Sequence, residues 1–379
     1  MAMNFLFTEE QTLLAESVNK YVRDNFDLEQ RRQIEKTELG FMPEQWQTFA
    51  ELGWLALPFS ESSGGLDGSV VDTSIIMNGI GQGLRQEPYL ASIVLAGTAL
   101  RIAANETQSA HYIGPLLDGS LKGSFAYVEP QSRYNHYNIE TTATQQESGF
   151  ILNGTKSVVL NANAADFIIV SARTKGESTD RDGISLFIVD TQADGVTMQD
   201  YPTVDGLHAA EVLFENVTLS ESNLLGTLHK AADTLDTVMN EAIIAVAAEA
   251  VGAMEVLYRD TADYAQQRVQ FDHPLSDFQV VKHRLVDMFM QTEQAKALQE
   301  RAAKEYEEDP QTAQKSIHAL KVLIGQAGRF VGENAVQLHG GMGMTEELKI
   351  GHYFKRLVVI NSMFGDMDFH FEKFMACQD

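Results

Sequence analysis

A long helical pattern that ends abruptly in a glycine-rich turn constrains this sequence more than any other feature. Between residues 317 and 338, apolar residues recur at three- and four-residue spacing, which predicts one buried face of a helix. Three glycines then end the pattern within four positions: Gly340, Gly341 and Gly343. Because glycine has no Cβ, its backbone adopts positive φ easily and lets a ligand approach closely. The turn is therefore a candidate binding element.

The residues after the glycines suit the start of a second helix. Thr345 is a favourable N-cap, and the carboxylates of Glu346 and Glu347 favour the first turn of a helix. A helix, a glycine turn and a new helix start can present free backbone N–H groups to a phosphate. An ordinary helix connection explains the turn equally well when it is taken alone, so its interpretation depends on the rest of the chain.

Length, charge and cysteine content exclude several classes of protein. The 379 residues are enough for two or three cooperating units. The 53 acidic and 28 basic residues give a net charge of −25, which argues against a nucleic-acid or anionic-membrane partner. The single cysteine, Cys377, permits no intramolecular disulfide and predicts no cysteine-based metal site. Without a signal peptide or a membrane-length apolar run, the chain is predicted to be cytoplasmic.

The apolar periodicity changes twice along the chain, which predicts an α+β fold with three domains. Residues 1–121 have helical spacing, with a capping box at Thr8 and Gln11. Residues 122–228 contain short apolar runs near Asn-Gly and Asp-Gly turns, which predict an antiparallel, barrel-like or sandwiched sheet. Residues 229–379 return to helical spacing and predict a helical bundle. Whether the β domain has a site or merely spaces two helical domains stays open at this point.

Two longer motifs give this arrangement a specific resemblance. Residues 268–275, Arg-Val-Gln-Phe-Asp-His-Pro-Leu, and residues 337–343, Gln-Leu-His-Gly-Gly-Met-Gly, resemble the two flavin-contact segments of the acyl-CoA dehydrogenases. The likeness extends over the chain, including Glu129-Pro130 and Asn153-Gly154-Thr155-Lys156. Within the family, residues 201–206 and 352–357 resemble the small subunits of the pimeloyl- and steroid-type enzymes.

The resemblance implies an FAD-dependent α,β-dehydrogenation of an acyl-CoA thioester to the 2-enoyl-CoA. Electrons would pass to electron-transfer flavoprotein, in fatty acid or steroid side-chain β-oxidation. The resemblance also implies a tetramer, homomeric or heteromeric, with FAD at the subunit interfaces. The chemistry is physically coherent, because a desolvated carboxylate gains basicity and hydrogen bonds to the thioester oxygen stabilise the developing enolate.

The half of the family's flavin site that binds adenosine diphosphate is intact in this sequence. The resemblance assigns the following residues to it: Arg268, Gln270, Phe271, Leu275, Gln279, Gln337, Leu338, Gly340 and Gly341. Arg268 has a fixed charge and several donors, which suit a pyrophosphate, and Phe271 can cover an adenine. A surface ion pair and a buried core phenylalanine are the alternative roles of these two residues. The family's usual glycine after Phe271 is Asp272.

The half of the site that holds the isoalloxazine ring departs from the family pattern. Val128 replaces a threonine, and Val158 and Leu160 replace an aromatic residue and a hydroxyl residue. The resemblance therefore leaves only backbone contacts at Tyr127 and Val128.

The catalytic base is also displaced. Gly365 stands at the position of the family's usual glutamate, and Asp366 follows it. Glu241 lies beside Ala242, the position of an alternative base in some members. Asp366 and Glu241 are the two candidate bases, although Asp366 suits a solvated position and Glu241 suits the start of its helix.

Three functions follow from these departures. The chain acts alone as an FAD-dependent acyl-CoA dehydrogenase, or it completes the flavin site of a sister chain that holds the ring and the base. A third, weaker hypothesis is a flavin-free relative that only binds a CoA ester.

Overall fold

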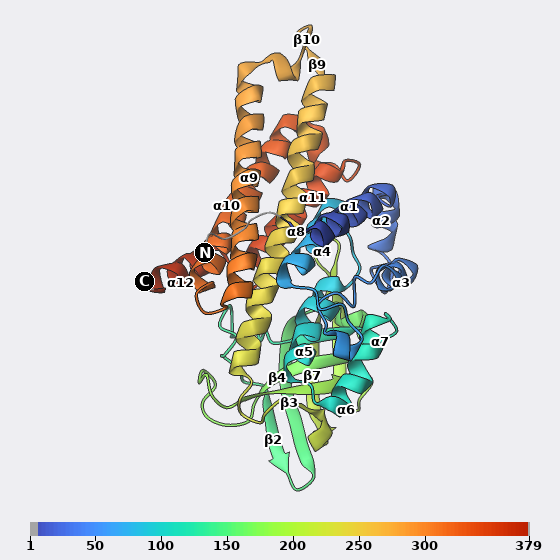
Figure 1. The fold of residues 1–379 in the computed structure, drawn as a ribbon, viewed down its shortest axis with the longest axis vertical. Helices are drawn as coiled ribbons and strands as arrows, with labels where there is room; N and C mark the ends of the chain where they lie inside the picture. Colours follow the sequence, from blue (N-terminus) through green and yellow to red (C-terminus); the bar gives the residue numbers. More distant parts are fainter. Residues whose placement is uncertain (1–6, 378–379) are drawn as a thin grey trace. The chain divides into compact units, whose positions relative to one another are not determined.

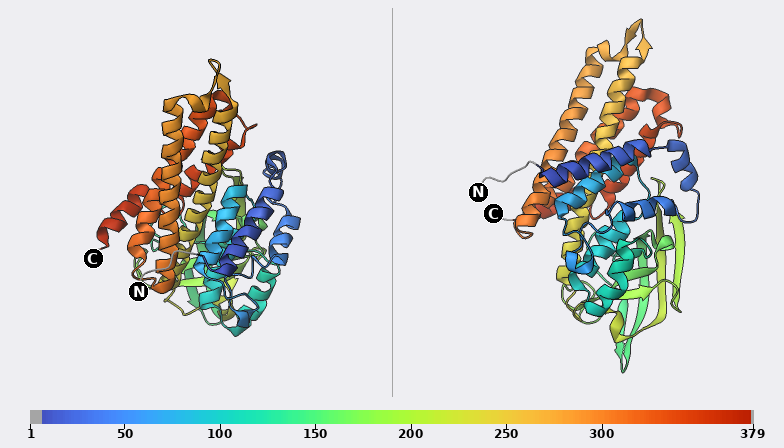
Figure 2. Two further views of the ribbon diagram at one scale, coloured as in Figure 1. Left: turned by 45° about the horizontal axis from the view of Figure 1, so that its top comes forward. Right: turned by 45° about the vertical axis from the view of Figure 1, so that its right-hand side comes forward.

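The computed structural model describes residues 7–377, and its contacts divide the chain into two compact units. The helical unit comprises Met1–Leu28, Ser69–Arg85 and Ile243–Asp379, and the β-containing unit comprises Glu29–Gly68 and Gln86–Ala242. Along the chain the elements are helical, then β, then helical (Figures 1 and 2), which confirms the predicted α+β fold. The domain boundaries after residues 121 and 228 stay predictions.

The helical unit is built from long helices. Its helices are α1 (Glu9–Asp24), α4 (Val70–Gly83), α8 (Ala232–Gln267, which begins in the other unit), α9 (Gln279–Glu308), α10 (Gln314–His339), α11 (Lys349–Ser362) and α12 (Met367–Ala376). A short hairpin of β9 (Val269–Gln270) and β10 (His273–Pro274) joins α8 to α9, which lie side by side in Figures 1 and 2.

The predicted helical periodicity accounts for the ends and faces of these helices. The capping box of α1 is present, because the Gln11 backbone donates to the Thr8 hydroxyl and the Thr8 backbone donates to the Gln11 side chain, both at 3.1 Å. The apolar stripe of α10 is buried at Ile317, Leu320, Ile324, Ala327, Val331 and Ala335, and its last member, Leu338, is half-buried. The stripe therefore faces the core of the unit, as predicted.

Two glycines let α4 and α8 pack with their backbones in contact. A Cβ at Gly81 would lie 1.9 Å from the carbonyl oxygen of Glu249, and a Cβ at Gly252 would lie 2.0 Å from that of Asn78. Any larger residue at either position would force the helices apart.

The helix after the glycine turn begins later than predicted. The chain forms a 3-10 helix, η7 (Gly340–Met344), and α11 starts only at Lys349. The Thr345 hydroxyl donates to the carbonyl oxygen of Met342 at 2.8 Å, so it closes the 3-10 turn and does not cap α11. The predicted first turn at residues 345–347 is therefore wrong.

The β-containing unit carries shorter helices and one sheet. Its helices are α2 (Leu28–Ile34), α3 (Pro43–Glu51), α5 (Thr98–Ala103), α6 (Glu106–Gln108), α7 (Gly114–Leu117), the 3-10 helices η1 (Glu61–Ser63), η4 (Ala162–Ala164) and η5 (Glu221–Asn223), and the π-helices η2 (Leu90–Gly97) and η3 (Ser109–Ile113). Its strands are β1 (Gly123–Ala126), β2 (Thr142–Gln146), β3 (Gly149–Leu160), β4 (Phe167–Arg173), β5 (Ile184–Asp190), β6 (Val196–Pro202), β7 (His208–Leu219) and β8 (Leu224–Leu225).

The sheet is largely antiparallel, as predicted. Its strand order is β6-β7-β3-β2-β4-β5-β8, and the predicted apolar runs lie in β3, β4, β5 and β7. The exceptions are β1, which pairs with β4 in parallel, and a single parallel pair between β2 and β4. Because β1 has only 4 residues, its sequence has too little periodicity to predict a strand there.

Buried side chains of these strands form one contiguous apolar cluster, with Phe150, Leu152, Val170, Phe187 and Phe214 among its members. Over residues 7–377, no helix is long and apolar enough to cross a membrane.

Candidate functional site

Arg268 follows the last turn of α8 in the helical unit. Its backbone N–H donates to the Tyr264 carbonyl at 2.8 Å, and its own carbonyl accepts from the Leu275 N–H at 2.8 Å. The guanidinium group is exposed and has no hydrogen-bond or ion-pair partner within residues 7–377. The backbone of Arg268 is therefore fixed while its charge stays available to an external anion.

The hairpin between α8 and α9 presents an aromatic ring at its tip. Phe271 and Asp272 form its two-residue loop, with φ angles of 56° and 64°. Positive φ at both positions is typical of a type I′ turn, which usually carries Asn-Gly. The Phe271 side chain is 85% exposed. A bulky residue held at positive φ costs about 1–2 kcal/mol, and neither strain nor exposure serves the packing of this unit. The alternative role of Phe271, a buried core residue, therefore does not apply.

The other residues predicted to contact the diphosphate half lie in the connection between α8 and α9, at the first residue of α9, and in the last turn of α10. Gln270 donates its amide to the Val269 carbonyl, Leu275 begins the 3-10 turn η6 (Leu275–Asp277), Gln279 is the first residue of α9, and Gln337 and Leu338 lie in the last turn of α10. Gln279 and Gln337 are exposed, and their amides are open to solvent.

The glycine turn is anchored to α8 close to Arg268. The imidazole of His339 stacks on the Tyr264 ring, with a centroid distance of 4.3 Å and an interplanar angle of 25°. Tyr264 also accepts the Arg268 N–H, so a single residue joins the turn and the arginine. Gly340 has a φ of 62°, and no atom lies within 4 Å of a Cβ built on Gly340 or Gly341. The structure therefore brings Arg268 and an open glycine backbone together.

This arrangement fits the diphosphate of a dinucleotide cofactor. It offers an unpaired guanidinium group, an exposed aromatic ring and a backbone surface without Cβ atoms. These groups can supply charge, stacking and close backbone approach.

The ring-side residues belong to the β-containing unit and offer much less. The Val128 carbonyl already accepts the Ser157 N–H at 2.9 Å, and Tyr127 is half-buried. Val158 lies at a bulge of β3 with a φ of 52°, and its side chain is 47% exposed. Val128, Val158 and Leu160 have no side-chain donor, so these positions do not fit the polar side-chain contacts of a flavin ring.

A buried ion pair holds the segment that follows Val128. Glu129 accepts from Lys156 Nζ at 2.6 Å and from the backbone N–H groups of Glu140 at 2.7 Å and Thr141 at 3.1 Å. Burial alone would raise the pKa of Glu129, but the charge and hydrogen bonds of Lys156 hold it below its usual range. Glu129 is therefore an anchor of the segment and stays ionised.

The position that the resemblance assigns to the family's glutamate is closed by packing. Gly365 is buried with a φ of 111°, and a Cβ there would lie 2.5 Å from His370 Nε2 and 2.6 Å from the Phe369 ring. Asp366 is the N-cap of α12, where its carboxylate accepts the Phe369 N–H at 2.9 Å. The imidazole of His370 thus occupies the space that a side chain at position 365 would need.

Lys321 and a pair of histidines reinforce this loop. Lys321 Nζ donates to the carbonyl oxygens of Ile360 at 2.9 Å and Gly365 at 2.7 Å, and burial lowers its pKa to about 7. His318 and His370 face each other with their Nδ1 atoms 3.0 Å apart. Since His370 Nε2 lies 2.9 Å from the Phe364 carbonyl and must donate to it, His370 Nδ1 accepts and His318 Nδ1 donates.

Glu241, the other candidate base, lies inside α8 and is ion-paired. Its carboxylate accepts from Arg101 Nη2 at 2.7 Å and from the Thr98 hydroxyl at 2.7 Å. It does not cap the start of its helix, as the sequence suggested, because α8 begins at Ala232. Two donors from the β-containing unit therefore already hold this carboxylate.

Sequence reasoning missed Lys321 and the histidine pair. Their only signal is that Lys321 shares the spacing of the buried stripe between Ile317 and Ile324, where an apolar residue is expected. No group of three or more His, Cys, Asp or Glu residues in the described part of the chain is arranged to hold a metal.

Comparison with known proteins shows the family of this chain. Family profiles for the N-terminal, middle and C-terminal domains of acyl-CoA dehydrogenases match residues 8–120, 124–217 and 233–373. The short-chain specific acyl-CoA dehydrogenase of Megasphaera elsdenii is 33% identical over 270 residues, which cover 70% of each chain. Fold and sequence together define an oxidoreductase that acts on CH–CH groups. The chain belongs to the acyl-CoA dehydrogenase family, as its motifs predicted.

Solved structures share the whole fold. The structure described as PigA with FAD and proline has a TM-score of 0.91 and 25% identity, covering 99% of this chain and 98% of that one. The ChsE4–ChsE5 complex from Mycobacterium tuberculosis has a TM-score of 0.90 and 24% identity, covering 100% of both chains. FAD is the cofactor of the family, which confirms the predicted cofactor.

Proposed function

We propose that this chain is a subunit of a heteromeric acyl-CoA dehydrogenase and completes the flavin site of a sister chain. The assembly converts an acyl-CoA thioester to the 2-enoyl-CoA and passes electrons to electron-transfer flavoprotein. Its substrate is a fatty acyl or steroid side-chain thioester, and its compartment is the cytoplasm. When bound, FAD supplies the hydride acceptor. The single observation that carries the proposal is the closed position of the base at Gly365.

The closed position at Gly365 supports a partner subunit over a self-sufficient dehydrogenase. Removal of the α proton needs a carboxylate with free lone pairs in a desolvated pocket. Gly365 has no side chain, His370 fills the adjoining space, and Asp366 is engaged as a helix cap. A proton acceptor from a sister chain removes this conflict.

The intact diphosphate elements support a contribution to another chain's flavin. In this role Arg268 neutralises phosphate charge, Gly340 and Gly341 admit the diphosphate to the backbone, and Phe271 covers the adenine. Gln270, Leu275, Gln279, Gln337 and Leu338 complete the predicted contacts of this half. Tyr127 and Val128 are left with backbone contacts alone.

Exposed apolar side chains on α9 support an assembly with other chains. Val280, Val286, Phe289 and Met290 are between 45% and 62% exposed on this helix. Exposed apolar residues grouped on one element are typical of protein–protein interfaces. The two-chain ChsE4–ChsE5 complex shares this fold and gives a precedent for a heteromer. A tetramer with a related subunit is therefore the proposed assembly.

The test compares the chain expressed alone with the chain co-expressed with its sister chain. Flavin absorbance per chain and turnover of a panel of acyl-CoA esters are measured for both preparations. We expect little flavin and little turnover from the chain alone, and both on co-expression. A yellow homotetramer with robust turnover would refute the proposal and support the alternative function, a dehydrogenase that acts alone. In that case loss of turnover in Asp366→Asn would assign the base to Asp366, and loss in Glu241→Gln would assign it to Glu241.

A further inference from the structure

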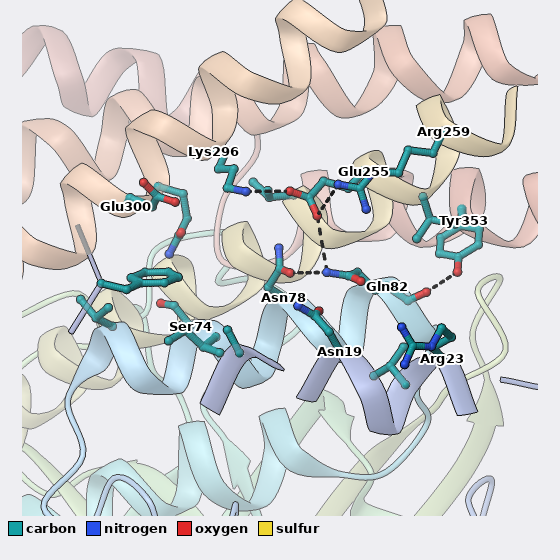
Figure 3. Close-up of a pocket in the computed structure, with 18 of the residues that line it drawn as sticks. Asn19, Arg23, Ser74, Asn78, Gln82, Glu255, Arg259, Lys296, Glu300 and Tyr353 are labelled. Atoms are coloured by element: carbon teal, nitrogen blue, oxygen red, sulfur yellow. Dashed lines mark hydrogen bonds and ion pairs between the residues drawn. The ribbon is translucent and has the colours of Figure 1, made fainter. Parts of the chain in front are cut away.

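A pocket of about 620 Å³ opens inside the helical unit, among residues that the flavin assignment does not use. Helices α1, α4, α8, α9 and α11 line it, and Figure 3 shows the polar side chains that face it. Much of the wall is apolar: Val22, Phe26, Ile75, Val251 and Val256 contribute to it. Pockets of this size, with an apolar wall and a few polar groups, are typical of small-molecule sites.

The polar wall is an ordered network centred on Glu255. Glu255 is buried and accepts from Lys296 Nζ at 3.0 Å and from Gln82 Nε2 at 3.4 Å. Gln82 Nε2 also donates to Asn78 Oδ1 at 2.7 Å, and Arg259 lies 3.9 Å from Glu255 (Figure 3). The network fixes the polar groups of α4, α8 and α9 before any ligand arrives.

One donor on this wall lacks an acceptor. Gln299 lines the pocket and is 6% exposed, and its Nε2, which is shielded from solvent, has no hydrogen-bond partner within the described residues. A buried polar group that lacks a partner is unfavourable unless a ligand or a water satisfies it. Gln299 lies one helical turn after Lys296 on α9, so the amide and the ammonium group share one face. A donor beside a cation is suited to an anionic oxygen.

The charge of the wall has the opposite sign to that of the chain. The basic lining residues are Arg23, Arg259, Lys296, Lys304 and Lys349, and the acidic ones are Glu255, Asp260 and Glu300. Five positive and three negative charges leave a net +2, against −25 for the whole chain. An anion is therefore attracted to this pocket although the rest of the molecule repels it.

We propose that this pocket binds an amphipathic carboxylate. The carboxylate group accepts from Gln299 Nε2 beside Lys296 when rotation of the Gln299 amide turns Nε2 towards the ligand, and the apolar part lies against the side chains of α1, α4 and α8. A bare inorganic anion would leave most of the apolar wall uncovered, and a neutral apolar molecule would leave Gln299 without an acceptor. The inference does not depend on the proposed function, because it uses none of the residues assigned to the flavin.

The test is a calorimetric titration of the full-length protein with decanoate, with decan-1-ol and inorganic phosphate as matched probes. We expect decanoate to bind more tightly than either probe. Gln299→Leu, which keeps the size of the side chain, should weaken decanoate binding by about ten-fold or more, the range for a hydrogen bond to a charged group. Gln294→Leu, an exposed position on the same helix outside the pocket, should bind as the wild type does.

Thermal unfolding separates a lost ligand from a damaged fold. Without decanoate, Gln299→Leu should unfold at the same temperature as the wild type or at a higher one, because the removed donor has no partner. With the same concentration of decanoate, Gln299→Leu should be stabilised less than the wild type and Gln294→Leu. Undetectable binding to the wild type would overturn the proposal. Equal binding of decan-1-ol or phosphate, or unchanged decanoate binding in Gln299→Leu, would also overturn it.

Discussion

Replacing Arg268 tests the diphosphate assignment most directly. Its guanidinium group has no partner within the described residues, so Arg268→Ala should change the free energy of unfolding by less than about 0.5 kcal/mol. If the guanidinium group contacts a diphosphate, its loss removes a charge-assisted hydrogen bond of about 1.5–3 kcal/mol, or about 10- to 150-fold in the FAD dissociation constant. The assay is flavin retention and fluorescence titration with FAD in the complex with the sister chain.

Gly341→Val gives a second, independent arm of this test. No atom lies within 4 Å of a Cβ at Gly341, so the fold should tolerate valine while the bulk blocks the approach of a diphosphate. Arg329→Ala, an exposed arginine on α10, and Gly114→Val, another glycine without neighbours at its Cβ, are the matched controls and should keep their flavin. Unchanged flavin affinity in both Arg268→Ala and Gly341→Val would refute the assignment.

Three further predictions concern the loop of the missing base. Gly365→Glu should not give the chain turnover of its own. It should lower the midpoint of thermal unfolding, because the new Cβ collides with His370. Adding His370→Val should recover part of the lost thermal stability. Lys321→Met should destabilise the fold by about 2–4 kcal/mol in urea titrations, because it leaves buried carbonyl groups unpaired, whereas Lys282→Met on the exposed face of α9 should be neutral. Burial lowers the pKa of His318 to about 4 and that of His370 to about 3, from 6.5, so the unfolded state takes up protons first on acidification. Stability should therefore fall as the pH drops from 6.5 towards 4, and a slope that His370→Val does not reduce would contradict this origin.

Much of the fold was predictable because periodicity survives in the sequence. The stripe of α10 and the short runs of β3, β4, β5 and β7 are repeated patterns of apolar residues. In such a pattern the spacing of the apolar residues predicts which face of the element is buried. The parallel pairing of β1 was not predictable, because pairing depends on a strand far away in the chain. The late start of α11 was not predicted either. Thr345 is a suitable N-cap by residue type, but its hydroxyl donates to the Met342 carbonyl within the preceding turn.

The candidate site divides in the same way. Residue type predicted the conformation of the glycine turn in part, since Gly340 adopts a positive φ whereas Gly341 and Gly343 do not. The partners of Glu241 did not follow, because Arg101 and Thr98 lie more than a hundred residues away along the chain. Residue types thus predicted which backbone conformations and hydrogen bonds are possible at each position. Contacts between distant segments decide which of these groups stay free to bind a ligand.

The loop around Gly365 indicates that one substitution would not restore a base at the position where the sequence predicts it to be missing. A glutamate restored at this position would need the space of His370, and His370 is held by hydrogen bonds to His318 and to the Phe364 carbonyl. Moving α12 outward would strain the bond from Lys321 to the Gly365 carbonyl. The interior of the helical unit therefore stabilises a loop without a base, while Arg268 and the glycine turn remain free at the surface. A chain packed in this way is suited to complete another chain's site, and it would need several coupled changes to catalyse the reaction alone.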